Sequence, residues 1–476
     1  YFNSMEDENI AQAIPNARAS QWMEENIPLF ECSQKNFEEM YYYRWWTLRK
    51  HIKETPVGYG MTEFLVNRSY ADKYNLIACA IGHHIYESRW LRNPEYLNQI
   101  IHTWYRGNEG GPMAKMTKFS SWNADAVLGR YMVDGNKEFL LDMVKDLEAE
   151  YARWEKTNRL SNGLYWQGDV QDGMEESISG GRRKQYARPT INSYMYGNAK
   201  ALSLIGIMTG DEGMAMKYGL KADSIKTLVQ DKLWNTDHHF FETMRGDASA
   251  EVREAIGYIP WYFNLPDASS QYDVAWKEVM DEKGFSAPYG LTTAERRHPE
   301  FRTHGVGKCE WDGAIWPFAS AQTLTAMANF MNNYPQTVLT DSVYFHQMER
   351  YVESQHHRGR PYIGEYLDEV TGYWLKGDQE RSRYYNHSTF NDLMITGLIG
   401  LRPRMDNTVE VNPLIPEGKW DYFCLDNVLY HGRNLTILWD KDGSRYQRGK
   451  GLHIYVDGKE VGHADTLTRV LCENVL

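Results

Sequence analysis

The feature that most constrains the fold of this chain is a long succession of helical segments, which ends near residue 401 in strand-like alternation. Between about residue 36 and residue 399, apolar residues recur at helical spacing, and Pro or Gly breaks such as 107–112 and 284–289 separate the segments. Asp211 and Asp341 stand where helix N-caps are expected. The predicted helices are 36–53, 73–92, 95–106, 123–133, 136–156, 191–209, 211–232, 250–263, 271–281, 313–332, 338–354 and 388–399.

These helices come in consecutive pairs, so they indicate six helical hairpins. Hairpins that each bury one face close into a ring, and the connecting loops then gather at its ends. We therefore predict a mainly α fold, an (α/α)6 toroid of about twelve helices. The longest connections, 158–190 and 355–387, are expected to carry function.

From about residue 401 the apolar residues alternate as they do in strands. The alternating segments are 407–412, 422–424, 435–439 and 452–456, and Asp-Gly turn signals stand at 442–443 and 457–458. We therefore predict two domains, a helical barrel over residues 1–400 and a small antiparallel β-sandwich-like module over residues 401–476.

The composition excludes several classes of protein. A net charge of -12 argues against nucleic-acid binding, which needs clustered Lys and Arg, and no apolar run approaches the length of a membrane span. The five cysteines are scattered, which argues against a disulfide framework or a CxxC metal site. No phosphate-binding loop, GxSxG string or dinucleotide fingerprint is present.

The N-terminal residues show no signal-peptide pattern, and the sequence leaves both the compartment and the oligomeric state open. The 33 Tyr and 16 Trp are numerous. Such side chains combine a flat apolar face with a polar group, which suits contact with sugar rings, although a large aromatic core has the same composition.

Two acidic stretches lie in the longest predicted loops. The segment Trp166-Gln-Gly-Asp-Val-Gln-Asp-Gly-Met-Glu-Glu-Ser177 holds four acidic residues beside aromatic ones, and Gly364-Glu-Tyr-Leu-Asp-Glu-Val-Thr-Gly-Tyr-Trp374 holds three. Glycoside hydrolysis needs one protonated carboxyl group at the leaving oxygen and one carboxylate that activates water or attacks the sugar. Two such loops can supply this pair if the fold brings them together.

Three motifs resemble those of a known group of enzymes. Gly173-Met-Glu-Glu-Ser177 resembles the Gly-hydrophobic-Asp-x-Ser motif that carries the general acid in six-hairpin glycosidases of the processing α-glucosidase I, trehalase and mannosylglycerate hydrolase group. Trp311-Asp-Gly-Ala-Ile-Trp316 matches their Trp-x-Gly-x-x-Trp motif, and Glu365 before the Thr371-Gly372 turn matches their base. This chain departs from the group in having Glu175 where Asp is usual and Asp312 where Arg is common.

The resemblance implies a glycosidase, an O-glycosyl hydrolase that inverts the anomeric centre and is exo-acting on an α-linked, glucose- or mannose-like sugar. Its substrate is an oligosaccharide or another glycoside, and no metal or other cofactor is implied. Glu175 is the predicted acid and Glu365 the predicted base. The candidate substrate contacts are Trp46, His83, Trp166, Trp311, Asp312 and Trp316.

Two other kinds of function stay open at this point. A sugar epimerase or polysaccharide lyase on the same toroid relies on His or Tyr, so His83 or His387 at the centre of the site favours it. A non-catalytic carbohydrate-binding protein keeps the aromatic residues, loses one carboxylate and binds sugar without turnover.

Overall fold

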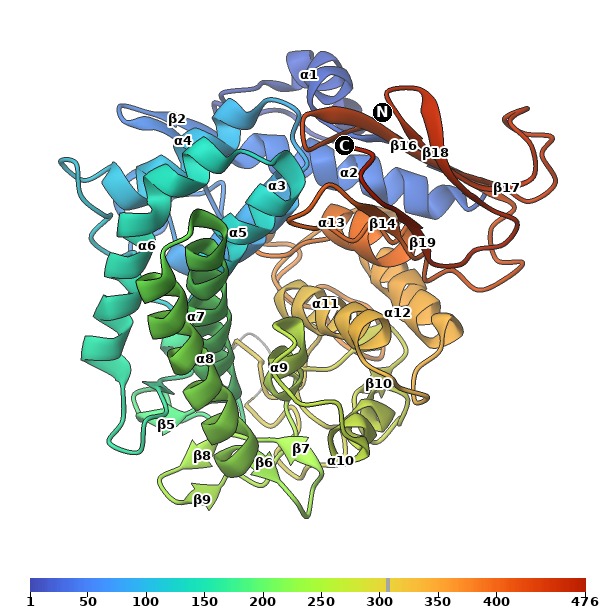
Figure 1. The fold of residues 1–476 in the computed structure, drawn as a ribbon. Coiled ribbons are helices and arrows are strands. Elements are labelled where there is room, and N and C mark those ends of the chain that lie inside the picture. The colour runs from blue at the N-terminus through green and yellow to red at the C-terminus, as the bar shows by residue number, and fades with distance from the viewer. Residues whose placement is uncertain (305–308) are drawn as a thin grey trace.

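The structure is a computed structural model that describes residues 1–304 and 309–476. Over these ranges the helices form a ring, and an antiparallel sheet lies beside it close to both ends of the chain (Figure 1). The predicted helical toroid is therefore present. The count of six hairpins stays a prediction, because several positions in the ring are held by helices of about one turn.

Eight long helices lie where the sequence predicts them. Side chains cap three of them, since Asn93, Asn136 and Asp211 each accept a hydrogen bond from a first-turn amide. Asp341 is the first residue of its helix, and Thr340 takes the N-cap position. These helices are α2 (Lys35–His51), α4 (Pro94–Arg106), α5 (Asn123–Asp134), α6 (Lys137–Asn158), α7 (Pro189–Thr209), α8 (Glu212–Lys232), α11 (Pro317–Asn333) and α12 (Asp341–Ser354).

Four predicted helices are shorter than expected or broken. The segment 73–92 contains only α3 (Ile81–Ser88), because Tyr74 and Asn75 have positive φ angles and end the preceding turn. The segment 250–263 narrows to α9 (Ile259–Tyr262), which Asn264, also at positive φ, follows closely. The segment 271–281 becomes α10 (Ser270–Asp273) with a 3-10 turn, and the segment 388–399 becomes α13 (Asn391–Leu393) with a π turn. The structure also contains a helix that was not predicted, α1 (Ala19–Asn26).

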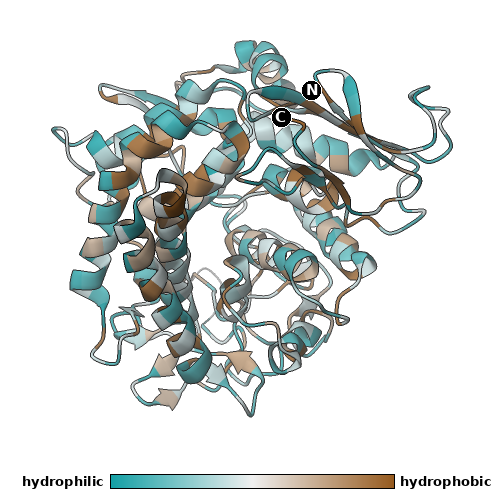
Figure 2. Ribbon diagram, viewed as in Figure 1, coloured by the Kyte–Doolittle hydropathy of each residue, from teal (hydrophilic) through white to brown (hydrophobic). Residues whose placement is uncertain are grey.

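Burial separates an inner from an outer set of helices. Most residues of α7 and α11 are buried, whereas α6 and α8 bury one face and expose the other. Outward surfaces of α6 and α8 are accordingly mostly hydrophilic, and α7 carries a strongly hydrophobic stretch (Figure 2). No helix of the described ranges combines the length and apolar character that crossing a membrane requires.

The sheet joins the two ends of the chain. Its strand order is β1 (Leu29–Cys32), β15 (Tyr422–Tyr430), β16 (Arg433–Asp440), β17 (Gly451–Val456) and β18 (Lys459–Ala464), and all neighbours are antiparallel. Leu29 pairs with Asp426, so an early segment completes the C-terminal sheet. β14 (Val409–Val411) pairs separately with β19 (Val470–Cys472). A domain boundary at residue 400 stays a prediction.

Short strands occupy several of the loops between the helices. Two-stranded pairs are β2 (Ile52–Thr55) with β3 (Gly58–Met61), β6 (Trp234–Asn235) with β7 (Phe240–Phe241), β10 (Ser286–Ala287) with β11 (Gly290–Leu291), and β12 (His356–His357) with β13 (Arg360–Pro361). A four-stranded sheet has the order β4 (Trp166–Gln167), β5 (Tyr186–Ala187), β8 (Met244–Arg245) and β9 (Ala248–Ser249).

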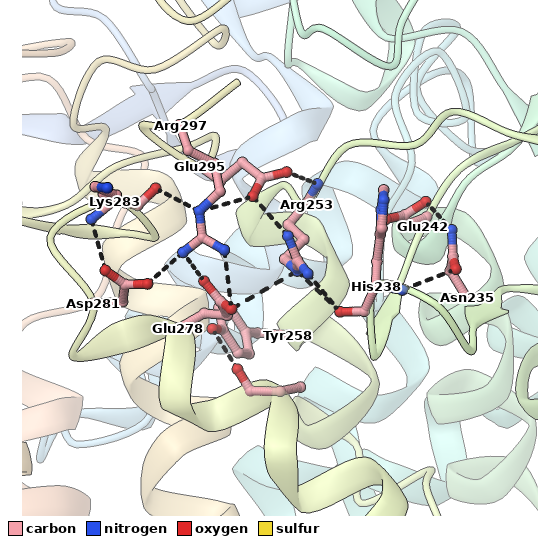
Figure 3. Close-up of polar contacts among 11 residues, drawn as sticks. Asn235, His238, Glu242, Arg253, Tyr258, Glu278, Asp281, Lys283, Glu295 and Arg297 are labelled. Atoms are coloured by element: carbon pink, nitrogen blue, oxygen red, sulfur yellow. Dashed lines mark hydrogen bonds and ion pairs between the residues drawn. The ribbon is translucent and has the colours of Figure 1, made fainter. Parts of the chain in front are cut away.

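A network of charged groups connects the loop between α8 and α9 with residues 278–297 (Figure 3). Arg253 donates to the carbonyl oxygen of His238 in the β6–β7 turn and forms an ion pair with Glu295 at 2.8 Å. Arg297 pairs with Glu278 at 2.8 Å. The network therefore joins the loop between α8 and α9 to the segment that leads toward Trp311.

Candidate active site

The two long acidic loops precede helices that begin at the same end of the ring. The loop 158–190 leads into α7, and the segment that follows Glu365 leads into α13. Both loops are tied to neighbouring segments, since Glu254 accepts a hydrogen bond from the Ser179 amide and Leu367 exchanges two backbone hydrogen bonds with Ile315.

Three of the four acidic residues in the first loop have structural partners. Asp172 forms an ion pair with Arg188 at 2.6 Å, with both side chains 0% exposed, and also accepts from Ser120 at 2.6 Å. Asp169 caps a 3-10 turn by accepting from the Val170 amide. Glu176 pairs with Arg182 at 2.9 Å. These contacts fix the loop on both sides of Glu175.

Glu175 has neither an ion pair nor a side-chain hydrogen-bond donor among the described residues. The chain reverses around it, because Gly173 and Glu176 both have positive φ angles. Burial raises the pKa of the Glu175 carboxyl to about 7, and the negative charges of Glu365 and Asp169 act in the same direction. This carboxyl group therefore holds a proton near neutral pH and is close enough to Glu365 to sense its charge.

Glu365 has the opposite environment. Its Oε2 lies 3.1 Å from the Lys376 ammonium and 3.0 Å from the Arg381 guanidinium, and its side chain is 5% exposed. Its amide donates to the Ser382 hydroxyl. The two loops therefore supply one carboxyl group whose pKa is raised by burial and one carboxylate held between two cations.

The remaining acidic residues of the second loop are structural. Asp368 Oδ1 accepts from the backbone amide and hydroxyl of Thr371, which closes the turn before Gly372. Asp368 and Glu369 also form ion pairs with Arg302, at 2.9 and 2.6 Å. They hold the loop against the segment 298–304 and leave Glu365 as its inward carboxylate.

A stack of three aromatic rings lies beside Glu365. Trp316 stacks on Trp311 and on Tyr366, in each case with ring centroids 4.6 Å apart, and the Lys376 ammonium lies 4.9 Å above the Tyr366 ring. Trp316 is therefore packed against two rings of the protein and is 3% exposed. The stack supports Lys376, and through it Glu365.

Asp312 lies within the motif that separates the two tryptophans. It is fully buried, and its Oδ2 accepts from the backbone amide of His304 at 3.0 Å and lies 2.7 Å from Nδ1 of the His304 ring. Among the described residues its Oδ1 has no hydrogen-bond partner. Asp312 therefore has one oxygen left for a further donor, as a substrate contact requires.

Gly313 yields the first testable prediction. A Cβ there lies 2.4 Å from a ring carbon of Phe301, and φ is 152°, so Gly313→Ala forces the ring or the backbone to move. We expect the free energy of unfolding, measured in denaturant titrations, to fall by about 1–3 kcal/mol, which is the usual cost of overpacking. Gly246→Ala, also at positive φ but with open space around it, is the control and should lose less. Equal losses contradict the role of the Phe301 contact.

The other predicted substrate contacts lie in different surroundings. Trp46 stacks on Tyr43 and carries the Lys50 ammonium 4.1 Å from its ring, while its indole N–H donates to Asn3, so protein encloses it. His83 is buried between aromatic rings, and burial lowers its pKa well below the usual value. Trp166 is half-buried in β4, opposite Ala187.

Glu63 adds a third buried carboxyl group near Glu175 and Glu365. It follows β3, is buried, and accepts from the Tyr385 hydroxyl and from the Cys79 thiol. Burial, together with the charges of Glu365 and Glu175, raises its pKa to about 8. His387 Nδ1 lies 3.8 Å from it. No loop motif marks Glu63, because Tyr385 and His387 lie more than 300 residues away along the chain.

Two family models match the chain. The model described as "Mannosylglycerate hydrolase MGH1-like glycoside hydrolase domain" matches residues 73–388, which include both acidic loops and the Trp311–Trp316 motif. The model described as "Glycosyl hydrolase family 65, C-terminal domain" matches residues 401–463, which cover most of the sheet.

Solved structures resemble the chain at two levels. A structure titled "Sialidase" is 84% identical with a TM-score of 0.99, and the match covers 100% of this chain and 44% of that one. This chain thus spans less than half of that protein. GH63 mannosylglycerate hydrolase from Thermus thermophilus shares the fold with a TM-score of 0.58 and 12% sequence identity, and the match covers 75% of this chain and 99% of that one. GH78 rhamnosidase from a Bacillus species shares it with a TM-score of 0.56 and 12% identity, and the match covers 87% of this chain and 40% of that one.

Proposed function

Because the chain belongs to the mannosylglycerate hydrolase MGH1-like glycoside hydrolase family, we propose that it inverts the anomeric centre of a glycoside with Glu175 as general acid and Glu365 as general base. The family match confirms the predicted resemblance to six-hairpin glycosidases, and residues 73–388 form a glycoside hydrolase domain. The carboxyl pair, the stereochemistry and the sugar are the proposed parts.

One observation carries the assignment of roles, namely the opposite environments of the two carboxyl groups. Glu175 has no ion pair among the described residues, and burial raises its pKa to about 7, so a substantial fraction of it holds a proton at neutral pH. Glu365 instead forms ion pairs with both Lys376 and Arg381. Pairs of carboxyl groups whose environments separate their protonation in this way act as acid and base in glycosidases.

In the proposed reaction, Glu175 donates its proton to the glycosidic oxygen as the bond from that oxygen to the anomeric carbon breaks. Glu365 removes a proton from a water molecule, whose oxygen attacks the anomeric carbon from the opposite face. After one turnover Glu175 is ionised and Glu365 is protonated, and exchange with solvent restores both. Asp312 and the edges of the aromatic stack contact the sugar in this arrangement.

The proposed substrate is an α-linked, glucose- or mannose-like sugar at the end of a glycoside. The 84% identity to the structure titled "Sialidase" supports a second candidate, an acidic sugar of the sialic acid type. Arg381 is partly exposed beside Glu365 and is the cation that a sugar carboxylate can approach. A panel of aryl α-glucosides, α-mannosides, α-rhamnosides and α-sialosides distinguishes these substrates.

The experiment that tests the proposal follows the product by proton NMR immediately after hydrolysis. An α-linked substrate gives a β-configured sugar first if the anomeric centre inverts. An α-configured first product contradicts inversion, and an unsaturated or epimerised product indicates the lyase or epimerase alternative. Saturable binding with no product over the whole panel indicates a carbohydrate-binding protein and contradicts the proposal.

The pH dependence provides a further prediction. Because Glu175 must be protonated to act as an acid, kcat should fall tenfold per pH unit as the pH rises well above about 7. The raised pKa places this loss near neutrality, whereas an ordinary glutamate would lose its proton near pH 4. The profile is measured with a substrate that has a poor leaving group. A dinitrophenyl glycoside, which needs no acid, should lose this alkaline limb.

A further inference from the structure

A second cavity, of about 300 Å³, lies inside the ring away from the carboxyl pair. The later turns of the helices that begin beside the candidate active site line it. Lys200 lies roughly 16 Å along α7 from Pro189, and Asn329 roughly 18 Å along α11 from Pro317, at 1.5 Å per residue. The cavity therefore belongs to the opposite end of the ring.

A layer of buried rings separates the cavity from the candidate active site. His83 packs between Trp122 and Phe318, with centroids 5.0 and 4.5 Å away, and Trp122 packs against Tyr194 at 4.8 Å. Tyr262 contacts Trp122 from the other side and lines the cavity. Because these rings are buried and in mutual contact, the cavity forms a separate chamber.

The charged groups around the cavity are only partly balanced. Arg89 is neutralised by Asp392, which lies 2.8 Å away. Asp125 accepts a hydrogen bond from the Tyr86 hydroxyl at 2.6 Å, and burial raises its pKa to about 6. These groups supply one ion pair and one further carboxylate.

Two cations on the cavity wall have no such partner. Neither Lys200 nor Arg402 has a carboxylate within 4 Å among the described residues. Arg402 donates only to neutral groups, the Asn329 side-chain oxygen at 2.7 Å and the Thr396 carbonyl at 3.3 Å. Burial lowers the pKa of both cations. Asp125 acts on Lys200 and Asp392 on Arg402 from beyond ion-pair distance. The wall as a whole carries three cations, Arg89, Lys200 and Arg402, against these two carboxylates, so an anion in this chamber is stabilised.

We propose that this chamber binds an anionic monosaccharide, with its carboxylate or phosphate between Lys200 and Arg402 and its ring against Tyr262. Its volume lies at the lower end of the range for small-molecule sites, roughly 300–1,000 Å³, which suits one sugar ring. Asp125 and Asn329 offer hydrogen-bonding groups to the sugar hydroxyls. This site does not depend on the function proposed for Glu175 and Glu365.

Isothermal titration calorimetry with three probes tests the ligand class. Glucuronate and glucose 6-phosphate should each saturate the protein, and glucose should bind at least tenfold more weakly. The anion that binds with the higher affinity shows whether the site prefers a carboxylate or a phosphate. Equal binding of glucose, or no saturation by either anion at tens of millimolar, overturns the proposal.

Variants locate the site. Lys200→Met keeps the length of the side chain and removes its charge, so it should weaken binding of the anionic probe at least tenfold. Lys145→Met, on the exposed side of α6, is the matched control and should leave binding unchanged. The Glu175→Gln and Glu365→Gln double variant should also bind normally, because its substitutions lie beyond the layer of rings.

Two results contradict the assignment. Binding that survives in Lys200→Met, with thermal melting showing both variants folded, excludes the chamber. Binding that is lost in the double glutamate variant assigns the anion to the candidate active site. If Lys200→Met does not fold, Arg402→Lys, which retains the charge and shortens the reach, should lower the affinity and serves as the second variant.

Discussion

Replacing Glu175 by Gln should lower kcat by about a thousandfold for substrates with poor leaving groups, within the range of roughly 10²–10⁴ that acid–base catalysis supplies. The amide keeps the shape of the side chain but has no proton to donate to the glycosidic oxygen. With a dinitrophenyl glycoside the leaving group needs no proton, so the loss should be at least tenfold smaller. Steady-state kinetics on the two substrates measure the difference.

Glu176→Gln is the matched control. It changes the neighbouring residue, whose carboxylate pairs with the half-exposed Arg182, and should leave kcat within a few fold of the unmodified protein. Glu365→Gln should lose a similar factor on both substrates, because the base acts on water whatever the leaving group. A Glu175→Gln variant that keeps full activity with both substrates removes Glu175 from the mechanism.

Asp172→Ala should lower the free energy of unfolding by about 3–5 kcal/mol, the cost of leaving the buried Arg188 guanidinium without its partner. The substitution also removes the acceptor of Ser120. Chemical denaturation monitored by tryptophan fluorescence measures this loss. Activity should fall as well, because Asp172 and Arg188 fix the loop that carries Glu175.

The double variant Asp172→Ala with Arg188→Met separates the ion pair from the shape of the loop. Because it removes both charges, it should recover part of the stability lost by Asp172→Ala. Asp142→Ala, which breaks an exposed pair with Arg106, serves as the surface control and should have a much smaller effect. If the double variant is less stable than the single one, the uncompensated charge is not the cause.

The long helices could be predicted because each one carries its own signals. Asp211 caps α8 with its side chain, and Pro189 and Pro317 stand in the first turns of α7 and α11. The ends of the short helices could not, since 250–263 and 388–399 were predicted as full helices and contain only the short α9 and α13 with 3-10 or π turns beside them. β1 was missed because its partner strand lies at the far end of the sequence.

The candidate site was predictable as two loops but not as a set of contacts. Each loop contains several acidic side chains that are chemically alike, and only their contacts in the fold distinguish them. Asp172 is structural because Arg188 and Ser120 reach it, and no local pattern reveals Ser120. Likewise, the sequence marks Trp316 as aromatic and cannot show that Trp311 and Tyr366 stack on it.

The pairing of β1 with β15 has a consequence for the order of folding. Residues 29–32 are synthesised long before residues 422–430, which hold their hydrogen-bonding partners. Until then, the exposed edge of β1 and the apolar side chains around it lack their cover. Contacts of such high sequence separation close slowly. We therefore expect the pairing of β1 with β15 to be a late step in the folding of this chain.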